Sequence, residues 1–356
     1  MIAERPLSAL ELARASYRAI SLYAPDRTPC EIDLSDNTNL WGPPPAAAAV
    51  VRDAQASLLT RYPSLYAPVL KETIATYAGV SPDEIVTGCG SDDVLDSAIR
   101  AFSEPGQRVA YSDPSFPMVP IFARMNGLDP VAVPLRRDLD IDAERLLEAD
   151  ARIIYVCSPN NPTGTLASPR AIARVLEDAP GIVILDEAYA EFAGTGYVGS
   201  AAGHGRVLVV RTMSKAFGLA GLRIGYGCGA PELVAEVEKS RGPYKISAAA
   251  EAAAVAALRE DTEWVGTHLD EALHVRAEFA RSLAEIGLAP IPSRANFVLV
   301  PVPDAVAVAA RMRARGVAVR PFPDLTGLGD ALRITIGPRP MMQRCLDLLR
   351  EALACA

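Results

Sequence analysis

Short apolar runs rich in β-branched residues recur through the middle of the chain, with stretches of helical periodicity between them. Glycine, proline or aspartate bounds each run, as is typical of strands. We expect strands at residues 84–87, 108–111, 152–156, 182–186, 206–211 and 223–227. Strands that are apolar almost throughout belong in a sheet covered on both faces. The pattern therefore predicts an α/β fold.

A second pattern begins after about residue 247, where an alanine-rich helical stretch leads into a smaller α+β unit. We expect its strands at residues 296–300, 317–319 and 332–336, and its helices at residues 305–315 and 340–354. A proline-rich stretch, residues 41–45, sets off the first 40 residues, which have no strand signal. We expect residues 1–40 to pack on a small domain of residues 251–356, beside a large domain of residues 41–250.

Charge and cysteine content narrow the class of protein. The 43 acidic and 35 basic side chains give a net charge of −8, which argues against a nucleic-acid or anionic-membrane surface. The six cysteines are scattered, with no CxxC pair and no zinc-like spacing, so we expect free thiols and no metal site. No apolar window reaches membrane-spanning length. We expect a cytoplasmic protein that holds any anionic ligand in a local site.

One of only four lysines lies in an unusual setting. Lys215 follows an apolar strand in the segment 211–226, and its neighbours are apolar, small or hydroxylic. A lysine that forms a Schiff base needs such a desolvated site, so that its amine can be neutral and nucleophilic. Lys71 and Lys239, by contrast, adjoin glutamates as surface lysines do. We therefore expect Lys215 to carry the chemistry.

A carboxylate ends the apolar strand at residues 182–186. Ligands of open α/β sheets bind outside the carboxyl ends of the strands, so Asp186 points to where a cofactor would lie. It could pair with a pyridinium nitrogen, and Tyr189, three residues on, could donate to a ring oxygen. Taken alone, a strand-end aspartate can equally be a turn or cap residue.

Two loops complete the set of candidate segments. Asn161 lies in an irregular loop fixed by two prolines and Gly164, directly after the strand at 152–156. The glycine-rich turn at residues 87–93 lies between a strand and a helical run. Its backbone amides and the helix N-terminus could hold an anion. A glycine-rich turn is weak evidence by itself, so its role depends on the other segments.

These four segments, in this order, resemble the aspartate-aminotransferase superfamily of fold type I pyridoxal-phosphate enzymes, and more narrowly the histidinol-phosphate aminotransferase family. The resemblance covers nearly the whole chain. Its further matches are Tyr23, Asn37, Tyr62 between Arg61 and Pro63, Asn296 with Phe297, the segment 316–322, and the segment 332–337. It implies a large domain with a mostly parallel seven-stranded sheet, a smaller α+β domain, and pyridoxal 5'-phosphate as cofactor.

The resemblance also implies a role for each matched residue. The catalytic residues would be Lys215, which holds the cofactor as a Schiff base and shuttles protons, Asp186 and Tyr189. Further cofactor-binding residues would be Ser91, Asp92, Phe116, Asn161, Ala188, Thr212, Ser214 and Arg223. Phe116 stands where relatives usually have tyrosine. Tyr62 would reach the cofactor phosphate from the partner subunit, which implies a homodimer with shared sites.

The substrate-binding residues implied by the resemblance are Tyr23, Asn37, Arg320 and Arg333. Arg333 would grip an anionic group of the substrate through its bidentate fork. The departures from the family pattern bear on the substrate: Thr38, Leu40, Lys245 and Ser247 each replace a residue that relatives usually carry.

The implied activity is a ping-pong amino transfer from histidinol phosphate to 2-oxoglutarate, or its reverse. Three alternatives stay open at this point. The enzyme could serve an aromatic amino acid or specialised metabolism, it could be a lyase resembling threonine-phosphate decarboxylase, or the chain could be a non-enzymatic cofactor-binding domain. The absence of a DNA-binding extension and the complete catalytic set argue against the last.

Overall fold

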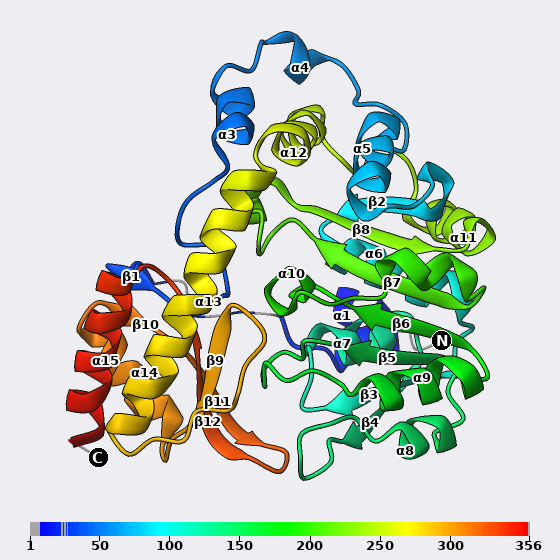
Figure 1. Ribbon diagram of the computed structural model, residues 1–356. Coiled ribbons are helices and arrows are strands. Elements are labelled where there is room, and N and C mark those ends of the chain that lie inside the picture. Colours follow the sequence, from blue (N-terminus) through cyan, green and yellow to red (C-terminus); the bar gives the residue numbers. More distant parts are fainter. Residues whose placement is uncertain (1–7, 23, 25, 27, 355–356) are drawn as a thin grey trace, which may run out of the picture.

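A seven-stranded sheet forms the centre of the larger part of the molecule (Figure 1). The structure is a computed structural model that describes residues 8–22, 24, 26 and 28–354. The strand order is β2-β8-β7-β6-β5-β3-β4, and β8 alone runs antiparallel to its neighbours. The strands are β2 (Ile85–Cys89), β3 (Arg108–Asp113), β4 (Asp129–Pro134), β5 (Ile153–Cys157), β6 (Ile182–Asp186), β7 (Val207–Thr212) and β8 (Ile224–Gly229). The α/β class and the mostly parallel sheet are confirmed.

Helices cover both faces of this sheet, which explains why its strands are apolar almost throughout. In β5, Ile153 and Tyr155 face one layer, and Ile154 and Val156 face the other. The first layer contains α6 (Ser91–Phe102), α7 (Met118–Met125) and α11 (Pro231–Arg241). The second contains α5 (Pro68–Ala78), α8 (Ala143–Glu148), α9 (Pro169–Asp178) and α12 (Ala248–Glu260).

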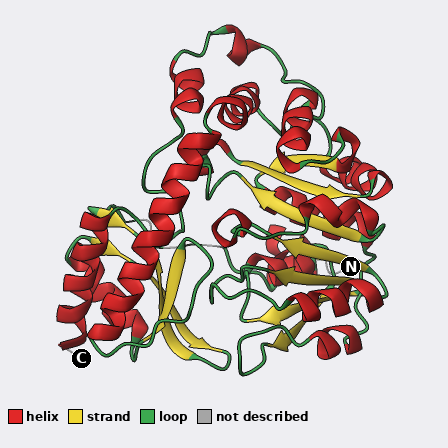
Figure 2. Ribbon diagram, viewed as in Figure 1, coloured by secondary structure: helices red, strands yellow, loops and turns green. Residues whose placement is uncertain are grey.

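The smaller part of the molecule has an antiparallel sheet of order β11-β12-β9 and a short parallel pair, β1-β10. Its strands are β1 (Ile32–Asp33), β9 (Phe297–Pro301), β10 (Val317–Ala318), β11 (Arg320–Leu325) and β12 (Gly329–Thr335). The helices α13 (Thr262–Glu285), α14 (Ala305–Ala314) and α15 (Arg339–Ala354) pack on these strands around a separate apolar core (Figure 2).

The remaining elements that the structure describes are five helices and three short turns. They are α1 (Ala9–Leu12), α2 (Ala15–Arg18), α3 (Pro45–Arg52), α4 (Ser57–Thr60), α10 (Ala190–Ala193), and the short 3-10 turns η1 (Pro82–Glu84), η2 (Val198–Gly203) and η3 (Ala220–Leu222). Within the described residues, no helix is long and apolar enough to cross a membrane. The cytoplasmic location stays a prediction.

The described residues among the first 40 contact both parts of the molecule. The sequence pattern gives no strand signal there, yet β1 pairs with β10 and Leu34 joins the smaller core. A strand of two residues is too short to produce a periodic signal. By contrast, Arg14, next to α2, donates to the Met125 carbonyl at the end of α7, on the larger part. The domain boundaries at residues 40 and 250 stay a prediction.

Prolines explain the two longer strands that the sequence pattern does not predict. β4 contains Pro130 and Pro134, and β11 contains Pro321 and Pro323. Both are edge strands, the positions where a proline, which cannot donate a ladder hydrogen bond, is tolerated. A proline weakens the prediction of a strand wherever it occurs, so the sequence pattern alone cannot identify these two edge strands.

Candidate active site

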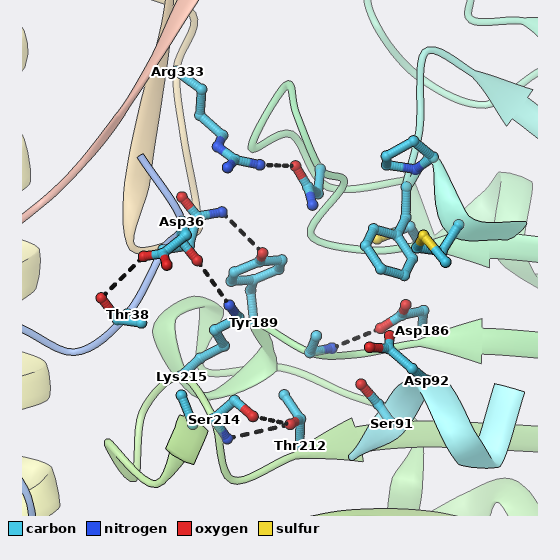
Figure 3. A pocket seen from close by; sticks show the side chains of 18 of the residues that line it. Asp36, Thr38, Ser91, Asp92, Asp186, Tyr189, Thr212, Ser214, Lys215 and Arg333 are labelled. Atoms are coloured by element: carbon cyan, nitrogen blue, oxygen red, sulfur yellow. Dashed lines mark hydrogen bonds between the residues drawn. The ribbon is translucent and has the colours of Figure 1, made fainter. Parts of the chain in front are cut away.

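A cleft of about 540 Å³ lies at the carboxyl ends of β5, β6 and β7, and residues from β11 and β12 complete it. Among its lining residues are Cys157, Asp186 and Thr212, the last residues of those three parallel strands. Figure 3 shows Arg333 at one end of the cleft, Ser91, Thr212 and Ser214 at the other, and Lys215 and Tyr189 between them. This is the place where open α/β sheets bind ligands.

Lys215 is positioned by the loop that follows β7. Its Nζ donates to the Asp36 carbonyl at 3.2 Å and lies 5.9 Å from the centre of the Tyr189 ring. Burial, followed by the positive charge of Arg333, lowers the pKa of the Lys215 amine to about 8. Roughly a tenth of the amine is therefore neutral and nucleophilic at pH 7, far more than for a lysine of ordinary pKa.

Asp186 ends β6 and is buried. Its Oδ2 accepts the Tyr155 hydroxyl at 2.7 Å, and its Oδ1 accepts the Ala188 backbone N–H at 3.0 Å. Burial raises the pKa of the Asp186 carboxyl to about 6, against the opposing effect of these two hydrogen bonds. A buried carboxylate held in this way suits a cationic partner that would share its charge.

Tyr189 is buried beside Lys215 and packs edge-on against Phe297, with 5.2 Å between ring centres. Its hydroxyl accepts a hydrogen bond from Asn37 Nδ2 at 3.0 Å. Burial raises the pKa of Tyr189, so the hydroxyl keeps its proton. Because its oxygen already accepts from Asn37, its own O–H can donate into the cleft.

Arg333 is held rigidly at the other end. Its guanidinium donates to Asn161 Oδ1 at 2.6 Å and to the Ser35 carbonyl at 2.7 Å, and it lies 5.5 Å from the ring centres of Phe297 and Phe322. The bond to Asn161 fixes that amide, because its oxygen is engaged and its NH2 group is left for a ligand.

The end of the cleft near α6 can hold an anion. Ser91 begins this twelve-residue helix, whose N-terminal amides and dipole favour negative charge. A Cβ on Gly90 would lie 2.4 Å from Arg223 Nη2, so only glycine permits this close approach. The hydroxyls of Thr212 and Ser214 lie 3.0 Å apart at the same end. Backbone amides, two hydroxyls and a guanidinium thus lie together at this end of the cleft, where they could bind an anion.

Most of the predicted site residues line this cleft. They are Asn37, Ser91, Asp92, Phe116, Asn161, Asp186, Ala188, Tyr189, Thr212, Ser214, Lys215, Arg223, Arg320 and Arg333. Tyr62 is not among the lining residues of its own chain; it is 85% exposed and stacks on Tyr244. Tyr23 lies outside the described residues.

The departures from the family pattern have different surroundings. Thr38 lines the cleft, where its hydroxyl donates to Asp36 at 3.2 Å. Leu40 packs on the smaller core, Lys245 forms an ion pair with Asp93 at 3.2 Å, and the Ser247 hydroxyl caps α12. Of the four substitutions, only Thr38 contributes to the lining of the cleft in the described structure.

Some lining residues are missing from the sequence prediction. Ser35 and Asp36 come from the loop after β1, Met118 from α7, and Phe322 from β11. Ser35 and Met118 belong to no matched segment, and each enters the cleft only because the chain folds back there. A signal existed for the other two, since Asp36 directly precedes the matched Asn37 and Phe322 ends the matched segment 316–322.

The arrangement fits pyridoxal phosphate. Its aldehyde would meet the neutral amine of Lys215, its ring nitrogen the Asp186 carboxylate, and its phosphate the amides, hydroxyls and guanidinium near Gly90. Such a cleft can form a covalent link to a carbonyl compound, stabilise negative charge on a ring, and bind a second anion at Arg333.

Comparisons with known proteins agree with this chemistry. The family model "Aminotransferase class I and II" matches residues 30–349. The histidinol-phosphate aminotransferase of Ruegeria pomeroyi is 39% identical to this chain, over 90% of this chain and 90% of its own length. The histidinol-phosphate aminotransferase of Caldanaerobacter subterraneus is 33% identical, over 96% of this chain and 99% of its own length. The crystal structure of histidinol-phosphate aminotransferase from Sinorhizobium meliloti in complex with pyridoxal-5'-phosphate superposes with a TM-score of 0.86 at 27% identity, covering 96% of this chain and 97% of that one. This chain therefore belongs to the class I and II aminotransferase family and is a pyridoxal-phosphate-dependent aminotransferase of fold type I.

Proposed function

We propose that this aminotransferase exchanges an amino group between histidinol phosphate and 2-oxoglutarate, running toward histidinol phosphate with glutamate as donor in biosynthesis. One observation carries the proposal: Arg320 and Arg333 are direct cross-strand partners, and both line the cleft. Like charges directly opposite each other destabilise a sheet unless an anion offsets them. Two guanidinium forks suit a phosphate dianion, and the relatives named above are histidinol-phosphate aminotransferases.

Pyridoxal phosphate, when bound, supplies an aldehyde that condenses with primary amines and a protonated ring that accepts electrons. We propose that Asp186 keeps a proton on the ring nitrogen, and that Tyr189 and Asn161 donate to the ring oxygen. Ser91, Asp92, Thr212, Ser214 and Arg223 would hold the phosphate, and Phe116 and Ala188 would pack on the two ring faces. These roles leave Arg320, Arg333 and Asn37 for the substrate.

Lys215 has two tasks in this proposal. Its neutral amine would hold the cofactor through the aldehyde until a substrate amine takes that place. The free Nζ would then be the base that moves a proton at the substrate carbon that bears nitrogen. The pKa of about 8 suits both tasks, because a base that titrates near the working pH can accept and return a proton.

Arg333→Ala should weaken binding of histidinol phosphate roughly 10- to 150-fold, because losing a charge-assisted contact typically costs about 1.5 to 3 kcal/mol. Cofactor binding should persist, since its phosphate has separate partners. The measurement is the substrate dependence of both half-reactions, followed by cofactor absorbance. Arg350→Ala, which alters an exposed arginine on α15, is the control. Unchanged substrate affinity in Arg333→Ala would remove this residue from the anion site.

We further propose that the enzyme is a homodimer with shared sites. Tyr62, Leu65, Tyr66, Val69 and Tyr244 form an exposed apolar patch, here called the Tyr62 patch. The rings of Tyr62 and Tyr244 stack with 5.0 Å between their centres. Clustered exposed aromatic side chains are typical of protein interfaces. A second copy of the chain on this patch would bring Tyr62 toward the neighbouring cleft.

If Tyr62 acts across that interface, mixing two inactive variants should restore activity. Chains with Lys215→Ala and chains with Tyr62→Ala would form hybrid dimers in which one site has both native residues. Activity after mixing should exceed the sum of the separate preparations. Subunit exchange is verified by native mass spectrometry with one isotope-labelled partner. Verified exchange without recovery would refute the shared site.

A further inference from the structure

A buried tyrosine lies behind Asp186, on the side away from the cleft. Tyr155 is on β5, is 1% exposed, and is absent from the residues that line the cleft. In the sheet register, Cys157 pairs with Asp186, and Tyr155 lies two residues earlier on the same face. From there its hydroxyl reaches diagonally to Asp186 Oδ2 at 2.7 Å.

We propose that Tyr155 is a positioning residue that keeps Asp186 ionised and in one orientation for the cofactor ring nitrogen. The inference rests on the proposed role of Asp186. The Tyr155 hydroxyl anchors one carboxylate oxygen and the Ala188 N–H anchors the other. With both oxygens held, the plane of the carboxylate is fixed, and its remaining lone pairs are available on the cleft side.

The surroundings of Asp186 make this hydrogen bond important. Among the described residues, five titratable groups interact with it: Tyr155 and Cys157 on β5, Asp92 at the start of α6, the adjacent Glu187, and Tyr189. Burial raises the pKa of both the Tyr155 hydroxyl and the Cys157 thiol, so both keep their protons. The negative charges of Asp92 and Glu187 raise the pKa of Asp186 further.

The side chain that offsets these effects is Tyr155. Within the described part of the chain, no ion pair to Asp186 is present, so hydrogen bonds alone favour its charged form. The Ala188 bond comes from the backbone and does not depend on residue type. The tyrosine hydroxyl is therefore the variable contact through which the sequence sets the charge on Asp186.

The test is Tyr155→Phe, which removes the hydroxyl and keeps the buried ring. Tyr111→Phe is the matched control: Tyr111 is the register partner of Tyr155 on β3. In the cofactor-free protein, the Asp186 carboxyl is titrated by carbon-13 NMR and assigned with Asp186→Asn. Tyr155→Phe should raise its pKa by about one to two units, as expected for losing a hydrogen bond to a charged group. The control should leave this titration unchanged.

A second measurement uses cofactor labelled with nitrogen-15 in the ring. In Tyr155→Phe the ring nitrogen should lose its proton at lower pH than in the wild type, and kcat should fall roughly tenfold with KM unchanged. An unchanged Asp186 titration would overturn the inference, even if the variant melts at a lower temperature, because that result indicates packing alone. Normal turnover in Asp186→Asn would instead refute the proposed role of Asp186.

Discussion

Lys215→Ala should lower the rate of amino transfer by at least about 10²- to 10⁴-fold, the usual contribution of a positioned acid-base group. The loss should be large because Lys215 both binds the cofactor and moves the proton. The other lysines cannot replace it, since Lys71, Lys239 and Lys245 form ion pairs with acidic side chains at 2.6 to 3.2 Å. The loss of rate is measured by single-turnover kinetics with an amino donor as substrate. Lys239→Ala is the control.

The same assignment predicts where the cofactor is attached. Borohydride reduction of the yellow holoenzyme should fix the cofactor on Lys215, as read by peptide mass mapping. Since only the neutral amine attacks an aldehyde, cofactor uptake by the cofactor-free protein should accelerate as the pH rises through the Lys215 pKa of about 8. An adduct on Lys71, Lys239 or Lys245 would contradict the assignment.

Asp186→Asn should lower the rate of amino transfer on the order of 10²- to 10³-fold, the range seen when a preorganised electrostatic partner is lost. An amide cannot hold the ring nitrogen protonated, so the ring becomes a poor acceptor of electrons. The cofactor should remain bound, because Ser91, Ser214 and Arg223 lie at the separate phosphate end.

This variant is measured by pre-steady-state half-reactions, with cofactor occupancy followed by absorbance. Asp178→Asn, at the exposed end of α9, controls for the loss of a carboxylate on a helix that packs on the large sheet, away from the cleft. Turnover near the wild-type rate at full occupancy would show that Asp186 has no part in the chemistry.

The central sheet could be predicted because its strands are buried on both faces. The strand at residues 182–186 matches β6, and its neighbours along the chain deviate by one or two residues. The edge strands β4 and β11 could not be predicted, because their prolines are tolerated only through edge position, which a local pattern does not reveal. β1 could not be predicted either, since two residues become a strand only through pairing with β10.

In the candidate site, too, residues in recognisable sequence patterns could be predicted, whereas contacts made only in the folded chain could not. Lys215, Asp186 and Asn161 could be predicted because they follow apolar strands, and the carboxyl ends of parallel strands meet at one edge. The hydrogen bond from Tyr155 could not, since its hydroxyl lies within an apolar run and its partner is on another strand. The departures from the family pattern are also an incomplete guide to the cleft: Ser247 caps a helix, whereas Met118, which lies in no matched segment, lines the cleft.

The most direct test of the proposed function compares histidinol phosphate with histidinol as amino donor to the purified holoenzyme. The donors carry nitrogen-15 in the amino group, and labelled glutamate formed from 2-oxoglutarate is measured by mass spectrometry. If the pair of Arg320 and Arg333 binds phosphate, the phosphorylated donor should give a kcat/KM at least about tenfold higher. Equal use of both donors, or no labelled glutamate from histidinol phosphate, would contradict the proposal that the cleft is built for a phosphorylated amine.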